Sequence, residues 1–288
     1  MVRTDVSTAL DRSRYEVEVD DRFETDELDR RLWLPWYLPH WSSRERSAAR
    51  YRVGGGTLRL RIDADQQPWS QEFDGDVVVS SLQTGEFCGP LGSAVGQLRF
   101  RDGVVVREAQ RNVALYTPTY GLFELRARAI ADAANMVALW MIGYEDEPTR
   151  SGEICICEIF GRDVGASSAR VGMGIHPWAD PALRDEFAAE AIAIDATQSH
   201  VYAAEWTPEH VAFYVDDTLV KVVGQSPSYP MQFMLNIYEF RDDRDLPSPP
   251  EAYAKMFVVE RFTGYRPVRG PGARAPAFSA RSRSDSVA

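Results

Sequence analysis

Short apolar or alternating stretches recur along the chain from Phe23 onward, and turn-forming pairs separate them. Stretches such as YGLFELRARAI, NMVALWMIGY and PMQFMLNIYEF are typical of β-strands, whose side chains alternate between two faces. Pairs such as DG, GG, TP and DD fall between these stretches and indicate antiparallel strands at short spacing. Helical periodicity is rare, and its best candidate is PALRDEFAAEAIAI, residues 181–194. The pattern therefore predicts an all-β chain.

The chain of 288 residues is long enough for two stacked sheets. We expect a single all-β domain over residues 21–265, a β-jelly-roll sandwich of two curved antiparallel sheets with a concave cleft. Residues 1–20 are mostly polar and predict a flexible N-terminal arm. Residues 266–288 are rich in Arg, Pro, Gly and Ser and predict a disordered tail.

The charge distribution narrows the classes of partner. The formal net charge is −11, and the segment 261–288 contributes six arginines and one aspartate, which leaves −16 on the rest. A domain with this negative charge repels nucleic acid and anionic membranes. We therefore expect neither as a partner. A neutral polysaccharide is compatible with this charge.

The three cysteines form no disulfide framework, and Cys155 and Cys157 lack the spacing of metal ligands. We therefore expect no metal site. The N-terminal residues contain no apolar core of a signal peptide, and no apolar run is long enough to span a membrane. The expected location is cytoplasmic, or secreted if an export signal precedes this sequence.

The stretch SGEICICEIFG, residues 151–161, breaks the alternation of a regular strand. Ile154 and Ile156 fall on one face, whereas Ile159 falls on the opposite face although it is equally apolar. One extra residue near Cys157, a β-bulge, would return all three isoleucines to the core. The apolar pattern therefore predicts a bulge in this strand.

The same bulge places Glu153, Cys155 and Glu158 together on the other face of the strand. Two carboxylates on one face are the minimum needed for glycoside cleavage, and retaining enzymes hold them roughly 5–5.5 Å apart. The simpler interpretation of a single strand glutamate is a solvated side chain. The shared face favours the catalytic interpretation.

The motif SGEICICEIFG resembles the bulged active-site strand of family 16 glycoside hydrolases, which include laminarinases and lichenases and carry Glu-x-Asp-x-x-Glu there. Four further segments resemble the family in the same order along the chain: YGLFELRARA, MVALWMIG, HVYAAEWTPEHVAFYVDDTLV and PMQFMLNIYEF. The resemblance implies that Glu153 is the nucleophile and Glu158 the general acid/base. Cys155 stands where the family has aspartate, and we expect a neutral thiol there because two glutamates disfavour its ionisation.

The resemblance also implies a set of substrate-binding residues. Each has a structural alternative: an outward ion pair for the charged residues, core packing for the indoles and a structural role for the histidine. The set comprises Glu124, Arg126, Trp140, His176, Trp178 and Asn236. The glycines that usually follow the family's counterpart of Asn236 are replaced by Tyr238, Glu239 and Phe240.

Indole rings gather in RRLWLPWYLPHWSS, which carries Trp33, Trp36, His40 and Trp41. Such a segment forms either a wall on which sugars stack or a hydrophobic lid folded over the domain. Because loops often carry specificity on a rigid scaffold, we expect a wall and include Trp36 among the substrate-binding residues.

Together these features predict a retaining endo-β-glucanase-like enzyme acting on β-1,3 or mixed-linkage glucan. Two alternatives stay open: a weakened or inactive carbohydrate-binding module on the same scaffold, and a transglycosylase. We expect a monomer without a cofactor, and a structural calcium ion, which relatives often carry, stays open.

Overall fold

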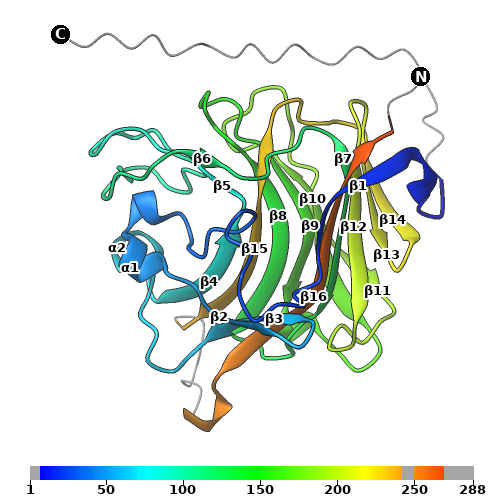
Figure 1. Ribbon diagram of the computed structural model, residues 1–288, viewed down its shortest axis with the longest axis horizontal. Helices are drawn as coiled ribbons and strands as arrows, with labels where there is room; N and C mark the ends of the chain where they lie inside the picture. The colour runs from blue at the N-terminus through cyan, green and yellow to red at the C-terminus, as the bar shows by residue number, and fades with distance from the viewer. Residues whose placement is uncertain (1–6, 242–249, 269–288) are drawn as a thin grey trace.

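Two antiparallel β-sheets packed face to face form the fold of the computed structural model, which describes residues 7–241 and 250–268 (Figure 1). One sheet has eight strands in the order β14-β13-β12-β7-β16-β3-β2, with β1 paired to β16. The other has six strands in the order β11-β10-β9-β8-β15-β4. The prediction of an all-β jelly-roll sandwich is confirmed.

The eight-stranded sheet consists of β1 (Tyr15–Asp21), β2 (Arg50–Gly54), β3 (Thr57–Ile62), β7 (Gly121–Arg128), β12 (His200–Trp206), β13 (Val211–Val215), β14 (Thr218–Val223) and β16 (Lys255–Pro267). The six-stranded sheet consists of β4 (Val77–Gln83), β8 (Asn135–Gly143), β9 (Glu153–Phe160), β10 (Ala169–His176), β11 (Ala188–Ile192) and β15 (Met231–Phe240). The remaining elements are the two-stranded sheet of β5 (Gly85–Glu86) and β6 (Val113–Ala114), the short helices α1 (Arg44–Ser47) and α2 (Gln71–Asp74), and the 3-10 turns η1 (Arg12–Arg14), η2 (Pro39–Trp41), η3 (Gly161–Asp163) and η4 (Pro250–Ala252).

The main core lies between the two sheets and is built from alternate residues of each strand. In β3, Leu58, Leu60 and Ile62 are fully buried, and their neighbours in sequence are half-buried. Phe233 and Leu235 of β15 enter the same core from the facing sheet. The period-two pattern in the sequence is therefore the direct consequence of one face of each sheet being buried.

A second apolar cluster covers part of the opposite face of the six-stranded sheet. Tyr37, Trp41 and Trp69, which come from loops before β4, pack with Trp140 of β8 and Tyr238 of β15. In Figure 1 the blue and cyan segments carrying α1, α2, β5 and β6 stand beside β4 and β15. On the neighbouring strands β9 and β10, Glu158 and His176 stay partly exposed.

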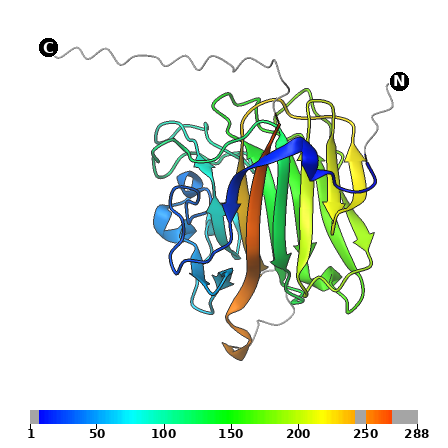
Figure 2. The same ribbon diagram turned by 45° about the vertical axis from the view of Figure 1, so that its right-hand side comes forward.

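The N-terminal prediction was wrong for residues 15–20. These residues belong to β1, which pairs antiparallel with β16 along one side of the sandwich (Figure 2). The alternation in YEVEVDD is weakly apolar, so its strand character comes from hydrogen bonds with β16. Residues 1–6 of the predicted arm lie outside the described residues.

The helix expected within residues 181–194 is also replaced by strand. β11 occupies its centre and pairs with β10 at the edge of the six-stranded sheet. Tertiary pairing overrides the local helical preference of the alanines there. β16 runs two residues beyond the predicted domain end at 265, and the predicted tail from residue 269 onward lies outside the described residues.

No helix within residues 7–241 and 250–268 has the length and apolar character needed to cross a membrane.

Candidate active site

Strand β9 contains the β-bulge that its apolar pattern predicts. Leu139 of β8 pairs with Cys157, and the next residue, Trp140, pairs with Cys155. Ile156 is therefore the extra residue between two adjacent pairs. A matching shift occurs on the other side of β9, where it meets β10. The prediction is confirmed, because Ile156 and Cys157 both face the core between the sheets.

The bulge brings Glu153, Cys155 and Glu158 onto the face that points away from the main core. Cys155 belongs to the apolar cluster on that face, and Glu153 lies two residues before it on the same side. Glu158 lies opposite Gly172 of β10. A Cβ at Gly172 would come within 2.5 Å of the Phe187 ring and 3.2 Å of the Glu158 Cβ, so glycine here leaves room chiefly for the Phe187 ring and relieves a tight contact with Glu158.

The two carboxyl groups influence each other and sit in a poorly solvated setting. The pKa of Glu158 is raised to about 7, first by burial and then by the charge of Glu153, against the opposing effects of His176 and Arg162. Burial also raises the pKa of Glu153, whereas His176 and a hydrogen bond from Trp178 lower it. The surroundings therefore favour the proton on Glu158 and the charge on Glu153.

Trp178 is the direct partner of Glu153. Its indole Nε1 donates to Glu153 Oε2 over 2.8 Å, although 46% of its side chain is exposed. His176 lies opposite Glu153 on β10, forms a 3.0 Å contact between its Nδ1 and Asp185 Oδ2, and stacks on Phe187. Both residues from the predicted set thus lie at the carboxylates. Trp178 has a positive φ of 45°, a strained conformation that aims its ring at the site.

Cys155 is fully buried between the two glutamates, and its Sγ lies 3.6 Å from the carbonyl oxygen of Gly172. Burial and then the charges of Glu158 and Glu153 raise the pKa of this thiol well above its usual value. A neutral thiol donates a weak hydrogen bond and carries no charge. It therefore separates the glutamates without acting as a nucleophile.

A row of stacked aromatic rings crosses the same face. Trp140 stacks on Tyr238 at 5.8 Å between ring centroids, Tyr238 on Phe240 at 6.0 Å, and Phe240 on Phe160 at 5.9 Å. Trp140 and Tyr238 are buried within the row, whereas Phe160 and Phe240 are half-buried. Neither phenylalanine was predicted to bind substrate, although Phe160 stands one residue after the segment GEICICEI and its aromatic ring was a signal for such a role.

Asn236 lies below this row instead of at the surface. It is fully buried on β15, and its Nδ2 donates to the carbonyl oxygen of Met234. Tyr238 stands two residues further along the same strand, and therefore on the same face. The predicted asparagine is therefore held inside the sheet and is not exposed on the cleft surface.

Glu124 and Arg126 do not join the site, and their assignment to the cleft was wrong. They lie on β7 in the eight-stranded sheet, with Glu124 accepting hydrogen bonds from Arg12 and from Tyr265 Oη. Phe123 on the same strand faces the main core. Alternation then directs both charged side chains to the outer face, so the structural alternative of an outward ion pair holds for Glu124.

The indole-rich segment folds inward, so the expectation of a sugar-stacking wall was wrong for three of its rings. Trp33, His40 and Trp41 are fully buried. Trp36 is half-buried, donates its indole N–H to Glu86 Oε2 at 3.1 Å, and has the guanidinium of Arg44 3.9 Å from its ring centroid. The segment is thus a lid over the sheet. At the rim of this lid, Trp36 contacts both members of the ion pair between Arg44 and Glu86.

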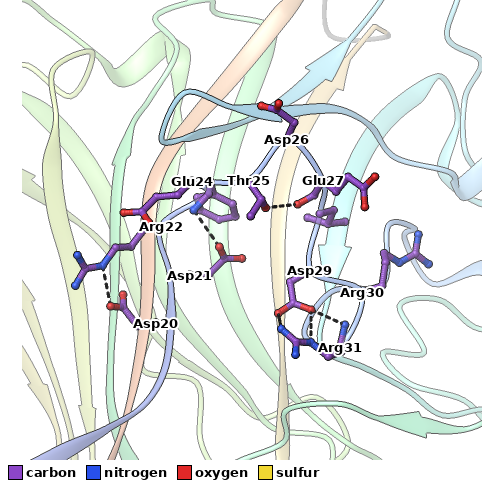
Figure 3. Close-up of a pocket in the computed structure, with 12 residues that line it drawn as sticks. Asp20, Asp21, Arg22, Glu24, Thr25, Asp26, Glu27, Asp29, Arg30 and Arg31 are labelled. Carbon is purple, nitrogen blue, oxygen red and sulfur yellow. Dashed lines mark hydrogen bonds and ion pairs between the residues drawn. The ribbon is translucent and has the colours of Figure 1, made fainter.

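A cavity of about 770 Å³ lies away from the glutamates, in the loop that follows β1 (Figure 3). Residues 20–31 line it, and none of them belongs to the six-stranded sheet. Several of its carboxylates already pair with arginines of the loop, as Asp29 does with Arg31 and Asp20 with Arg22. Within the part of the chain that the structure describes, no group of three or more His, Cys, Asp or Glu side chains could hold a metal ion.

The sequence is similar to a known protein family and to characterised members of it. The profile of "Glycosyl hydrolases family 16" matches residues 107–244. Endo-1,3-1,4-beta-glycanase EglC of Rhizobium meliloti is 23% identical over 239 residues, which cover 80% of this chain and 48% of that protein. This chain thus spans about half the length of that relative.

Two solved structures share the fold. A GlcNAcα1-4Gal releasing endo-β-galactosidase from Clostridium perfringens is 28% identical with a TM-score of 0.75, covering 91% of this chain and 66% of that one. The laminarinase from Rhodothermus marinus is 22% identical with a TM-score of 0.60, covering 88% of this chain and 98% of that one. Both align over nearly the whole sandwich.

The hydrogen bond from Trp178 to Glu153 generates a test that needs no substrate. Because a donor to a carboxylate stabilises its charged form, Trp178→Phe is expected to raise the pKa of Glu153. Carbon-detected NMR of protein labelled at glutamate side chains measures it. Trp36→Phe is the matched control, since it removes the indole donor of Glu86 instead. An unchanged Glu153 titration in Trp178→Phe would show that the indole does not control this carboxyl.

Proposed function

Since residues 107–244 of this chain belong to the family 16 glycosyl hydrolases, we propose that the protein is a retaining endo-β-glycosidase that cleaves a neutral β-1,3 or mixed-linkage β-glucan. The observation that carries this proposal is the pair Glu153 and Glu158, held on one face of β9 by its bulge. Both carboxyls are largely buried, and each has a different set of partners.

The two glutamates divide the chemistry of a double displacement. Glu153 attacks the anomeric carbon as Glu158 transfers its proton to the departing glycosidic oxygen, which breaks that bond and forms a glycosyl ester on Glu153. Glu158, now ionised, takes a proton from water, whose oxygen displaces Glu153 from the anomeric carbon. The sugar leaves with its original anomeric configuration, and both glutamates return to their starting states.

The partners of the glutamates support this division of roles. The nucleophile must be ionised, and Glu153 receives the indole N–H of Trp178. The acid must be protonated near neutrality, and burial with the neighbouring charge raises the pKa of Glu158 to about 7. Cys155, neutral between them, adds no third charge that would raise the Glu158 pKa higher.

A second candidate substrate class is a polymer with internal β-galactosidic bonds. It is favoured by the higher identity and TM-score of the Clostridium perfringens endo-β-galactosidase, 28% and 0.75, against 22% and 0.60 for the Rhodothermus marinus laminarinase. The same two glutamates would cleave either bond, since the reaction at the anomeric carbon is the same. Transfer of the glycosyl group to a sugar acceptor also uses these residues.

The alternative of a binding module without activity makes an opposite prediction. It is motivated by the thiol of Cys155, which accepts hydrogen bonds more weakly than a carboxylate and carries no charge. Such a module would bind a glycan and release no reducing ends.

Incubation with laminarin, lichenan and a β-galactan, followed by a reducing-sugar assay, tests the proposal. We expect new reducing ends from at least one polymer, internal cleavage in the product sizes, and β-anomers as the first products by proton NMR. Glu153→Gln is the control and is expected to lose this activity. Binding without products from every polymer would favour the module, and α-anomers would contradict a retaining mechanism.

The pKa of Glu158 predicts the alkaline limit of the reaction. Since the acid must carry its proton, kcat/KM for a polymer is expected to be present below pH 7 and to fall as the pH rises through about 7. Glu158→Gln should lower it by about 100-fold or more, in the range of general acid catalysis.

An aryl glycoside with a dinitrophenolate leaving group is the matched comparison, because its departure needs no proton. Bond cleavage from this substrate should keep its rate above pH 7. A polymer profile that stays flat to pH 9 would rule out Glu158 as the acid.

A further inference from the structure

A second cavity, of about 360 Å³, adjoins the catalytic pair on the Glu153 side. One wall is the loop of residues 94–102, and the other is formed by residues at the ends of β8, β9 and β10. The lining residues that can contact a ligand with a polar group or a large side chain are Val95, Arg99, Asp102, Glu145, Ser151 and Trp178. Its volume lies at the small end of ligand pockets, which span roughly 300–1,000 Å³.

The cavity connects to the reacting carboxylate through a shared side chain. Trp178 lines the cavity and donates its indole N–H to Glu153 Oε2. Ser151 lines the cavity two residues before Glu153, and its Oγ accepts the backbone N–H of Ala179. A molecule in the cavity would therefore contact the same indole that holds the nucleophile.

The loop that closes the cavity is fixed to the sandwich, so the cavity is preformed. The backbone N–H of Leu98 donates to Glu145 Oε1 at 2.6 Å. The carbonyl oxygen of Gln97 accepts the indole N–H of Trp41 at 2.8 Å, and Gln97 itself is fully buried. Preorganisation of this kind lowers the entropic cost of binding.

The lining suits an uncharged polar ligand. Glu145 is only 5% exposed, and burial raises its pKa to about 8 while the Leu98 N–H alone opposes the shift. Its carboxyl group is therefore protonated near neutrality and can both donate and accept hydrogen bonds. Arg99 and Asp102 at the rim are paired at 3.7 Å, so their charges offset each other. The half-exposed indole of Trp178 supplies an aromatic surface.

The closing loop is a separate segment from the strand that carries the two glutamates. Residues 94–102 lie before residues 107–244, where the family 16 profile matches. Variation in a loop on a constant scaffold is a common origin of specificity.

We propose that this cavity binds one uncharged pyranose unit of the substrate, next to the sugar that Glu153 attacks, and so selects which glycan is cleaved. A pyranose offers the hydroxyls that Glu145 and Ser151 can bond and the apolar C–H face that Trp178 can cover. The statement that this sugar is part of a substrate rests on the proposed glycosidase function. Binding of the sugar itself does not require catalysis.

The test places a larger side chain in the outer wall of the cavity, where it would occupy the space of the sugar. Val95 lines the cavity with 38% of its side chain exposed, and Val105, equally exposed at 38%, does not line it. Val95→Trp is compared with Val105→Trp in a Glu158→Gln background, which binds without turnover. The probes are laminaritriose and the disaccharide GlcNAcα1-4Gal, with calorimetry for Kd and saturation-transfer NMR for the bound sugar.

We expect at least one probe to bind, and Val95→Trp to weaken its Kd by about tenfold or more, equivalent to roughly 1.4 kcal/mol. Val105→Trp should change Kd by less than about twofold, and both variants should keep the thermal midpoint of the parent. If Val95→Trp does not fold, Val95→Phe provides the same obstruction with a smaller ring. Unchanged binding in the folded Val95 variant, or no binding of either probe, overturns the assignment.

Activity measurements separate this inference from the proposed function. If Val95→Trp with Glu158 intact cleaves its polymer with the KM of the parent, the glycosidase proposal stands and the proposed sugar subsite is wrong. If the parent protein releases no reducing ends but Val95→Trp abolishes probe binding, the cavity binds a sugar and the glycosidase proposal is wrong.

Discussion

One extra residue in β9 is the constraint on which the rest of the site depends. An unbroken pleat would send Glu153 and Glu158 to opposite faces, because they lie five residues apart and the side-chain period is two. One of them would then enter the core between the sheets as an unpaired carboxyl, at high cost in free energy. The bulge at Ile156 avoids this cost, since the added residue is apolar and packs into the core. The catalytic face and the stability of the sandwich thus have the same origin.

The loops that precede β4 and β7 give this face its chemical character. Their aromatic side chains cover β4, β15 and part of β8, so water is excluded from one side of the carboxylates. Burial is the first cause of the raised pKa of both Glu153 and Glu158. The individual partners then separate the two, with Trp178 donating to one carboxyl and none of the described side chains donating a hydrogen bond to the other. A hydrophobic lid and a single indole therefore set the different surroundings of the two carboxyl groups.

Local periodicity accounts for what the sequence could predict. The sandwich and the bulge follow from where apolar residues fall in individual strands. The motifs also placed Trp140, His176 and Trp178 on the same side as the glutamates, where the structure has them. The alternation of side chains along a strand does not show which of the two sheets the strand joins, so Glu124 was assigned to the wrong surface. The inward folding of Trp33 and Trp41, and the closure of a cavity by residues 94–102, arise from contacts between distant loops. Loops have no period, so these contacts left no signal in the sequence.

The most direct measurement of the central claim is covalent capture of the reacting carboxylate. A 2-deoxy-2-fluoro glycoside of the cleaved sugar with an activated leaving group slows the second displacement, so the glycosyl ester accumulates, and peptide mass spectrometry of the digested protein locates it. The account predicts one sugar per chain, attached to Glu153, and no attachment in Glu153→Gln. Attachment to Glu158, or to a residue outside β9, would contradict it.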